Sequence, residues 1–266
     1  MSKAPRQHRA RKRFGQNFLH DHAVIEQINE AIYPLSGQRL VEIGPGMGAL
    51  TGVLLESDCA LDVIELDRDL IPGLLAAFSL KPRFQLHNAD ALDFDFHSLL
   101  QADHREQLRV VGNLPYNIST PLIFKLLEDC AIIKDMHFML QREVVERLAA
   151  TPGNKQWGRL GIMAQYLCNV EHVFDVPPEA FRPAPKVQSA VVRMTPRNTS
   201  PWPECDAAAL GKLAKAAFAQ RRKTLRNNLK GLIDSAGLER LGIDPGARAE
   251  TLDLEQLISI TNAIDV

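Results

Sequence analysis

The hydrophobic and polar positions of the chain alternate between two patterns over its first half. Short apolar runs, typical of buried strands, fall at residues 39–43, 61–65, 84–87, 108–111 and 136–140. Stretches with helical periodicity separate them, such as the one that follows Gly48. Strands that alternate with helices form a parallel sheet with helices on both faces. The pattern therefore predicts an α/β fold built on a mostly parallel, Rossmann-like sheet.

The pattern changes after the fifth run. Two strand-like stretches, residues 164–174 and 187–194, flank the proline-rich segment PPEAFRPAP without room for a helical crossover, so we expect an antiparallel hairpin at the sheet edge. The segment TPRNTSPWPECD at residues 195–206 has the composition of a linker. Helical patterns follow at residues 207–220, 224–235 and 252–263. We expect an α/β domain over residues 1–200 and a small all-helical domain over residues 201–266.

Composition limits the class of protein. Hydrophobic residues make up 45% and charged residues 24% of the 266 positions, which is typical of a soluble globular protein. No apolar run approaches the roughly 18 residues of a membrane helix, and the basic N-terminus precedes no apolar segment, so we expect a cytoplasmic protein. The four cysteines form no CxxC pair, which argues against a metal site and a disulfide framework.

Two basic runs stand out against a net charge of −1. Residues 1–13 contain six lysines and arginines and residues 212–230 contain seven, with no acidic residue in either run. Clusters of this kind attract phosphate groups, which makes a nucleic acid a candidate partner. A solvated surface is an equal alternative for either run taken alone.

Candidate ligand-binding residues follow the predicted strands. In an open parallel sheet, ligands bind beyond the carboxyl ends of the strands. The residues at these ends are Gly44, Gly46, Gly48, Glu65 and Asp90. Glycines let backbone amides approach a ligand closely, and a carboxylate about 20 residues further on can accept both hydroxyls of a ribose. Gly44, Gly46, Glu65 and Asp90 are therefore candidate cofactor-binding residues.

Two cofactors fit this arrangement. The glycine loop matches the dinucleotide pattern GxGxxG/A with Glu65 as its acid, so an NAD-dependent oxidoreductase is one interpretation. Glu42 and Asp90 add carboxylates, which suit a cationic ligand better than a pyrophosphate. S-adenosylmethionine, a sulfonium with a ribose, an adenine and no phosphate, meets this requirement. The alternatives are a helix cap or salt bridge for Glu42 and a helix cap for Asp90.

The sequence NLPY at residues 113–116 follows the fourth predicted strand and suits an adenine base. The N6 of adenine is a weak nucleophile because its lone pair is delocalised into the ring. The Asn113 amide oxygen and the Leu114 carbonyl can accept hydrogen bonds from this nitrogen and stabilise its developing positive charge. Pro115 would fix the backbone, and Tyr116 would stack on the base for about 1–3 kcal/mol. The alternative is a turn with a core tyrosine.

These residues resemble the small-subunit ribosomal RNA adenine N6,N6-dimethyltransferases, the family whose loss gives kasugamycin resistance in bacteria. The matching motifs are KRFGQNFL at 12–19, VEIGPGMGALT at 41–51, VIELD at 63–67, NLPYNIS at 113–119, FRPAPKVQS at 181–189 and FAQRRKTLRNN at 218–228. The resemblance implies a class I S-adenosylmethionine-dependent methyltransferase sheet. It also implies dimethylation of two adjacent adenosines in the 3′-terminal hairpin loop of 16S rRNA, during biogenesis of the small ribosomal subunit.

The resemblance adds site residues that periodicity does not reveal. It implies cofactor contacts from Asn17 and Leu19, with Gly44, Glu65, Asp90 and Asn113 in the same role. It also suggests that Phe181 clamps the second face of the adenine, with a core anchor as the alternative. The chain departs from the common family pattern at Gln188, where many members have Asp, and at His20, where many have Asn. Neither position carries a proposed catalytic atom.

RNA as a substrate also follows from the chemistry. An adenine must leave its stack before its N6 can be methylated, and sequence-specific RNA recognition favours loops. The expected backbone contacts are Arg221, Arg222, Lys223 and Arg226. In a helix that starts near Ala216 these four cannot share one face, so some would brace the α/β domain. We expect a monomer that binds 16S rRNA within the small subunit or its precursor.

Three other functions compete with this one. A DNA adenine methyltransferase would share the chemistry and would act on a naked duplex. A ribosome-assembly factor would contribute by binding the particle and not by catalysis. An NAD oxidoreductase would bind nicotinamide and would have no use for Tyr116.

Overall fold

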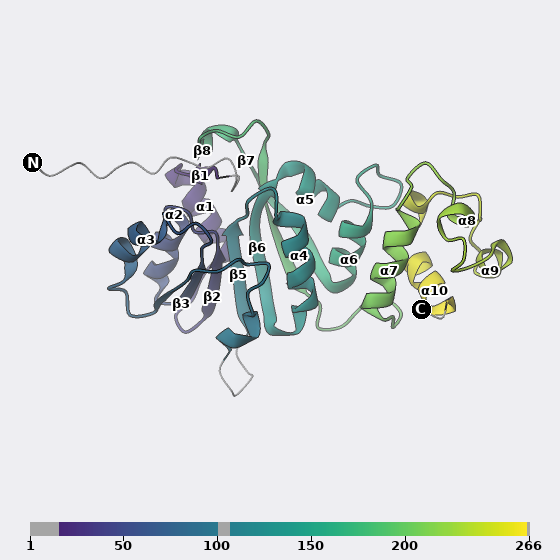
Figure 1. Cartoon of the computed structure of the whole chain (residues 1–266), viewed down its shortest axis with the longest axis horizontal. Coiled ribbons are helices and arrows are strands. Elements are labelled where there is room, and N and C mark those ends of the chain that lie inside the picture. The colour runs from purple at the N-terminus through teal and green to yellow at the C-terminus, as the bar shows by residue number, and fades with distance from the viewer. Residues whose placement is uncertain (1–15, 101–106, 265–266) are drawn as a thin grey trace, which may run out of the picture. The chain divides into compact units, whose positions relative to one another are not determined.

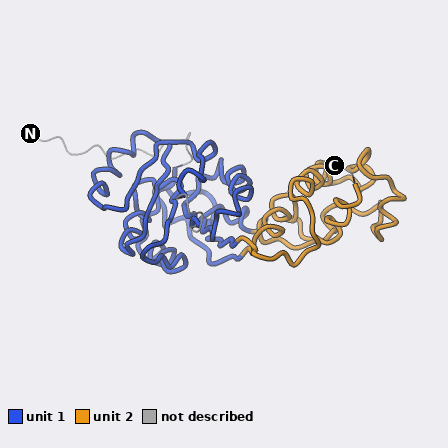
Figure 2. The backbone as a smooth tube through the Cα atoms, turned by 90° about the horizontal axis from the view of Figure 1, so that it is seen from below, with its two compact units in different colours: residues 1–145, 171–195 blue, residues 146–170, 196–266 orange. Residues whose placement is uncertain are grey.

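The computed structural model describes residues 16–100 and 107–264 (Figure 1). The basic run expected at residues 1–13 therefore lies outside the described residues. The chain divides into two compact units (Figure 2): residues 1–145 with 171–195, and residues 146–170 with 196–266. The boundary expected near residue 200 stays a prediction, because a compact unit is not a demonstrated independent domain.

A seven-stranded mixed sheet has the order β4-β3-β2-β5-β6-β9-β7. Its strands are β2 (Arg39–Ile43), β3 (Ala60–Ile64), β4 (Phe84–His87), β5 (Leu108–Asn113), β6 (Ile133–Gln141), β7 (Cys168–Val176) and β9 (Ser189–Pro196). Neighbouring strands from β4 to β6 pair in parallel, and β6 pairs antiparallel with β9. The strand order reverses between β2 and β5, which is where ligands bind in open α/β sheets. The expected mostly parallel α/β fold is confirmed.

Helices flank this sheet (Figure 1), and the last of them continues past residue 145, where the first segment of the first unit ends. They are α1 (His22–Ile32), α2 (Ala49–Leu54), α3 (Ile71–Phe78), α4 (Ser119–Glu128) and α5 (Arg142–Leu148), with 3₁₀ turns at Leu55–Ser57, Phe96–Leu99, Cys130–Ile132 and Pro178–Ala180. Helix α1 begins where the Asp21 carboxylate accepts hydrogen bonds from the Ala23 and Val24 amides. Its apolar face, which includes Ile25 and Ile28, joins a buried cluster with Val111 and Val191 of the sheet.

The two strands expected at the sheet edge are present there as the neighbours β9 and β7, but the first of them starts later than expected. Residues 164–167 belong to helix α6 (Arg159–Leu167), so the strand expected to start at Ala164 starts at Cys168. Five residues of this helix besides Gly161 are buried, and a Cβ at Gly161 would lie 2.5 Å from the Arg147 carbonyl oxygen. Close packing therefore favours the helix over the strand that the apolar run suggested. Strand β9 lies between β6 and β7, which leaves β7 at the edge.

A two-stranded sheet joins distant parts of the first unit. Strand β1 (Phe18–Leu19) pairs antiparallel with β8 (Phe181–Arg182), with Leu19 opposite Phe181. The His20 amide continues this pairing by donating to the Ala180 carbonyl at 3.0 Å. The pairing holds the segment before α1 against the proline-rich segment before β9.

The second unit contains α6 and the helices that follow residue 200. These are α7 (Ala207–Ala217), α8 (Leu225–Asn228), α9 (Ser235–Arg240) and α10 (Leu254–Ala263), with a 3₁₀ turn at Ala249–Thr251. The helix expected over residues 224–235 is wrong beyond Asn228: α8 ends there, Gly231 has a left-handed φ of +89°, and α9 begins only at Ser235. In the described part of the chain, no helix is long and apolar enough to cross a membrane.

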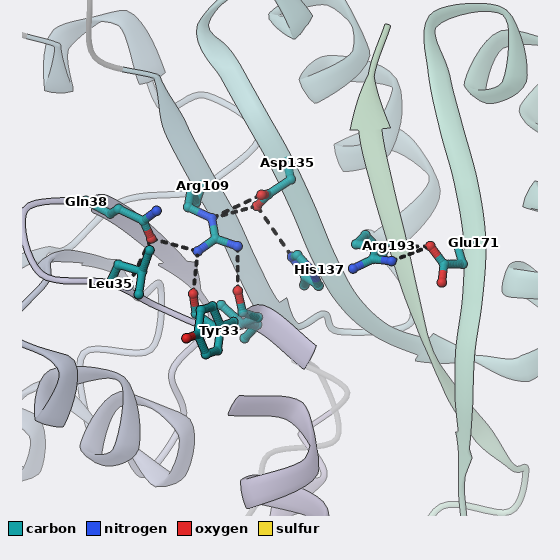
Figure 3. A network of polar contacts seen from close by, with 9 residues as sticks. Tyr33, Leu35, Gln38, Arg109, Asp135, His137, Glu171 and Arg193 are labelled. Carbon is teal, nitrogen blue, oxygen red and sulfur yellow. Dashed lines mark hydrogen bonds and ion pairs between the residues drawn. The ribbon is translucent and has the colours of Figure 1, made fainter. Parts of the chain in front are cut away.

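A buried arginine fastens α1 to the sheet (Figure 3). The guanidinium of Arg109, on β5, pairs with Asp135 of β6 at 3.0 Å and donates to the carbonyls of Ile32 and Tyr33 at the C-terminus of α1. Burial alone would raise the pKa of Asp135, but the nearby His137 Nδ1, 3.5 Å away, and the hydrogen bonds from Arg109 outweigh it and hold that pKa below its ordinary value. Arg109 thus satisfies helix carbonyls that lack partners within α1.

Candidate active site at the strand ends

One pocket lies at the carboxyl ends of β2, β3 and β5. Nine predicted site residues line it: Asn17, Leu19, Gly44, Gly46, Glu65, Asp90, Asn113, Leu114 and Tyr116. Gln16, Phe18, Met47 and Leu66 also line it and were missed by the sequence reasoning. Met47 and Leu66 each directly follow a predicted site residue. Both residues are exposed, at 56% and 46%, although their side chains are apolar. This exposure could have indicated a binding role, but only the fold reveals it.

The glycine loop lets the backbone pass close to other segments. Gly46 has φ +60°, and a Cβ there would lie 3.1 Å from the Phe18 ring, so a side chain would crowd the β1 segment. The Gly46 amide donates to Glu65 Oε2 at 3.3 Å. The loop therefore brings together the ends of β2 and β3 and the residues of β1.

Glu65 directly follows β3, and two backbone amides hold its carboxylate in place. Its carboxylate accepts hydrogen bonds from the Asp67 amide at 2.7 Å and from the Gly46 amide, and it is 6% exposed. Burial raises its pKa above the ordinary value. Gln16 donates to Asp67 at 2.8 Å, which ties the N-terminal segment to the same loop.

Glu42 is the most deeply buried acid of the pocket. Its Oε2 accepts a hydrogen bond from Thr51 Oγ1 of α2 at 2.6 Å, and burial raises its pKa to about 7. It therefore neither caps a helix through a backbone amide nor pairs with a cation within the described residues. With Glu65 and Asp90 it gives the pocket three acids, and the described lining contains no lysine or arginine.

Asn113 is oriented by a backbone carbonyl. Its Nδ2 donates to the Asn17 carbonyl oxygen at 3.0 Å. Because a carbonyl only accepts, the amide nitrogen must face Asn17, and Oδ1 remains an acceptor on the other side. The Leu114 amide donates to the Met139 carbonyl at 3.2 Å, while no hydrogen bond to the Leu114 carbonyl is found among the described residues. The NLPY segment thus carries two acceptors without a hydrogen-bond donor among the described residues, the Asn113 Oδ1 and the Leu114 carbonyl.

Tyr116 lies half-buried in the wall of the pocket. Its hydroxyl shares a hydrogen bond with Ser189 Oγ at 2.8 Å, and Ser119 Oγ donates to its backbone carbonyl at 3.2 Å. Burial raises the pKa of the phenol, so the hydroxyl stays neutral near pH 7.

Phe181 does not join this group. Its side chain is 2% exposed, belongs to the buried cluster with Leu19 and Val191, and does not line the pocket. In this structure Phe181 is a core residue that carries the pairing of β8 with β1. Its role as a clamp on the second face of the adenine stays a prediction.

The four predicted RNA-binding residues lie in the second unit, three of them in a turn and one in a short helix. Helix α7 ends at Ala217, so exposed Arg221, Arg222 and Lys223 occupy the turn before α8, and exposed Arg226 lies in α8. Arg221 donates to the carbonyl of Lys155 at 2.8 Å and to that of Trp157 at 3.4 Å. It braces a loop of its own unit, while the other three side chains point outward from short elements.

The comparisons with known proteins agree with this geometry. The sequence profile of the ribosomal RNA adenine dimethylase family matches residues 7–265. The chain is 60% identical over 258 residues to ribosomal RNA small subunit methyltransferase A of Pseudomonas aeruginosa, covering 97% of this chain and 96% of the relative. It is 57% identical over 266 residues to the protein of the same name from Chromohalobacter salexigens, covering 99% and 94%.

Two solved structures share the fold over most of the chain. A dimethyladenosine transferase from Plasmodium falciparum has a TM-score of 0.76 at 24% identity and covers 91% of this chain and 95% of its own. The 23S rRNA methyltransferase ErmE has a TM-score of 0.71 at 25% identity and covers 94% and 100%. The sequence matches, which span nearly the whole chain, decide the assignment: this protein belongs to the ribosomal RNA adenine dimethylase family.

Proposed function

We propose that this protein transfers methyl groups from S-adenosylmethionine to the N6 atoms of two adjacent adenosines in the 3′-terminal hairpin loop of 16S rRNA, twice each. The observation that carries the proposal is the orientation of Asn113, whose amide nitrogen donates to the Asn17 carbonyl and whose oxygen is left as an acceptor, in the pocket that Tyr116 also lines. Family membership supports the substrate class. The proposal places the protein in the cytoplasm, as a monomer acting on the small subunit or its precursor.

The pocket suits the proposed cofactor in charge and shape. Asn17, Leu19, Gly44 and Gly46 would hold it together with Glu65, Asp90 and Asn113. A lining with three carboxylates and, within the described residues, no lysine or arginine favours a cation and disfavours the pyrophosphate of a dinucleotide. When bound, S-adenosylmethionine supplies an electrophilic methyl group on a positively charged sulfur.

The residues around the adenine would act by positioning and by electrostatics. The Asn113 Oδ1 and the Leu114 carbonyl accept hydrogen bonds from N6, which favours a pyramidal nitrogen and stabilises its positive charge as the new bond forms. The Tyr116 ring holds the base in place. No general base is required, since the methylated nitrogen is acidic and its proton leaves to water. A second methylation needs the first methyl group turned away from the acceptors.

The direct test is transfer of labelled methyl groups from S-adenosylmethionine to small subunits that lack this modification, followed by nucleoside analysis. We expect N6,N6-dimethyladenosine in stoichiometric amounts. Binding of both cofactor and particle without any transfer would replace the proposal with the assembly-factor function. Comparable transfer to naked duplex DNA would replace it with the DNA methyltransferase.

The affinity for the cofactor is expected to rise with pH because of Glu42. With a pKa near 7 in the free protein, Glu42 is largely protonated at about pH 6 and largely ionised at about pH 8. A positive sulfonium binds better beside the ionised form, so its Kd should fall by about three- to tenfold over this range. Calorimetric titration with S-adenosylmethionine at the two pH values measures the change.

Two controls separate Glu42 from other groups. S-adenosylhomocysteine, which has a neutral sulfur, should bind with little pH dependence. The Glu42→Gln variant should lose the pH dependence for S-adenosylmethionine, although Glu65 also has a raised pKa. An unchanged pH dependence in that variant would assign the effect to Glu65 and not to Glu42.

The basic turn is expected to bind RNA phosphates. Arg222→Ala and Lys223→Ala should each weaken binding to small subunits and reduce the slope of log K against log salt by about 1, because each removes one phosphate contact. Filter binding at several salt concentrations measures both quantities. Lys134→Ala, which removes an exposed charge on β6 of the other unit, is the matched control. Equal salt slopes in all three variants would exclude the turn from the interface.

A further inference from the structure

Two serine hydroxyl groups form hydrogen bonds with Tyr116, one with its backbone carbonyl and one with its phenolic oxygen. Ser119 Oγ donates to its backbone carbonyl at 3.2 Å, and its phenolic oxygen shares a hydrogen bond with Ser189 Oγ at 2.8 Å. The ring between these points lines the pocket. A tyrosine held only by its backbone can tilt about its side-chain torsions, whereas a hydrogen bond at the far end of the ring restricts that motion.

Ser189 is well placed to hold the ring, yet it is not a wall of the pocket. It is fully buried, it is absent from the pocket lining, and it begins β9, where it pairs with Gln141 at the end of β6. The residue before it is fixed as well. The Arg142 amide donates to the Gln188 carbonyl at 3.0 Å, and Arg142 Nη1 donates to the Gln188 side-chain oxygen at 3.0 Å.

Ser189 differs from an ordinary core residue because its hydroxyl is hydrogen-bonded to a residue that lines the pocket. Its hydroxyl has one described side-chain partner, and that partner is a residue of the proposed base-binding group. Its backbone is held by strand pairing with Gln141, and the backbone of the preceding Gln188 is held by Arg142; both contacts are independent of the hydroxyl. Loss of the hydroxyl alone should therefore leave the strand in place and release only the ring of Tyr116.

We propose that Ser189 is a positioning residue that fixes the ring plane of Tyr116 for the target adenine and acts on methyl transfer only through that ring. The inference rests on the proposed function, because it assigns the adenine to Tyr116. A restrained ring presents one face to the base before binding, so less ordering remains to be done when the base enters. Ser189 thereby extends the site beyond the pocket lining to the start of β9.

A double-mutant cycle tests this role, with Ser189→Ala, Tyr116→Phe and the double variant. Each single variant should lower the single-turnover rate of methyl transfer by about fivefold, the effect of losing one hydrogen bond. The double variant should be no slower than either single variant, since the same bond is lost. The loss should fall on kcat and leave KM for the particle and the Kd of S-adenosylmethionine unchanged.

Thermal unfolding provides a readout that is independent of activity. The two single variants should lower Tm, and the double variant should lower it by less than their sum. Ser57→Ala is the matched control: it removes a hydroxyl that donates to the Leu54 carbonyl at 2.7 Å, in the same unit and outside the pocket lining. It should leave kcat at the wild-type value.

Several outcomes would overturn the inference. A wild-type rate for Ser189→Ala, or losses that multiply in the double variant, would show that Ser189 does not act through Tyr116. If Ser189→Ala fails to fold, Ser189→Cys keeps the volume with a weaker partner, and a wild-type rate there has the same meaning. An absence of transfer by the wild-type protein contradicts the proposed function instead, and coupling in Tm would then still test the Ser189 to Tyr116 contact.

Discussion

Methyl transfer by the Asn113→Ala variant is expected to be about 100- to 1000-fold slower than by the wild-type protein, the usual effect of removing one preorganised group that stabilises transition-state charge. The variant loses the Oδ1 acceptor and also the hydrogen bond that its Nδ2 donates to Asn17. Single-turnover transfer to undermethylated small subunits measures the rate. Binding of the variant to the particle should be unchanged, because the basic residues lie in the other unit.

Two further variants sharpen this test. Asn113→Asp keeps an acceptor but cannot donate to the Asn17 carbonyl, so it should also be slow, with part of the loss in cofactor affinity. Asn198→Ala changes an exposed asparagine outside the pocket and should be as fast as wild type. A rate within about twofold of wild type for Asn113→Ala would contradict the proposed role of Asn113.

Gly112→Ala is expected to have the largest effect on stability, about 3 kcal/mol or more. A Cβ at this position of β5 would lie 2.5 Å from the Ile43 carbonyl oxygen of the neighbouring strand β2. A backbone atom inside a sheet cannot move aside as a flexible side chain can, so β2 and β5 would have to separate. Urea unfolding followed by circular dichroism measures the loss.

A second glycine serves as the control for this prediction. Gly73 lies in α3 and is exposed, and a Cβ there would meet no atom within 4 Å. Gly73→Ala should leave stability unchanged or raise it by about 0.5–1 kcal/mol, because alanine loses less backbone freedom in a helix. Equal unfolding midpoints for Gly112→Ala and the wild type would mean that the strands can separate at little cost.

The strand pattern was readable from the sequence because short apolar or alternating runs were separated by helical stretches, and the central strand β2 is buried on both faces. Residues 39–43 and 84–87 were predicted with the bounds that β2 and β4 have in the structure. The expectation was wrong at residues 164–167, where an apolar run of strand-like appearance is the end of a buried helix. Periodicity cannot separate a buried helix from a buried strand in a short run, so packing decided this case.

The candidate site was partly readable for a related reason. Strand ends in an open sheet converge, so Glu65, Asp90 and Asn113 could be grouped from their places in the sequence. Asn17 and Leu19 precede the first large strand and carry no periodic signal; they came from the family resemblance. For Phe181, the sequence shows an aromatic residue between prolines but not whether its ring is covered, and only the structure shows its burial.

By itself, the sequence determined the fold class and the family of this protein and predicted the loops that line the pocket, because each depends on local patterns and on motifs. Only the tertiary structure decided the orientation of Asn113, the burial of Glu42 that raises its pKa, and the contact between Tyr116 and Ser189. These depend on atoms from segments far apart in the chain, and their free energies change with distances of less than an ångström.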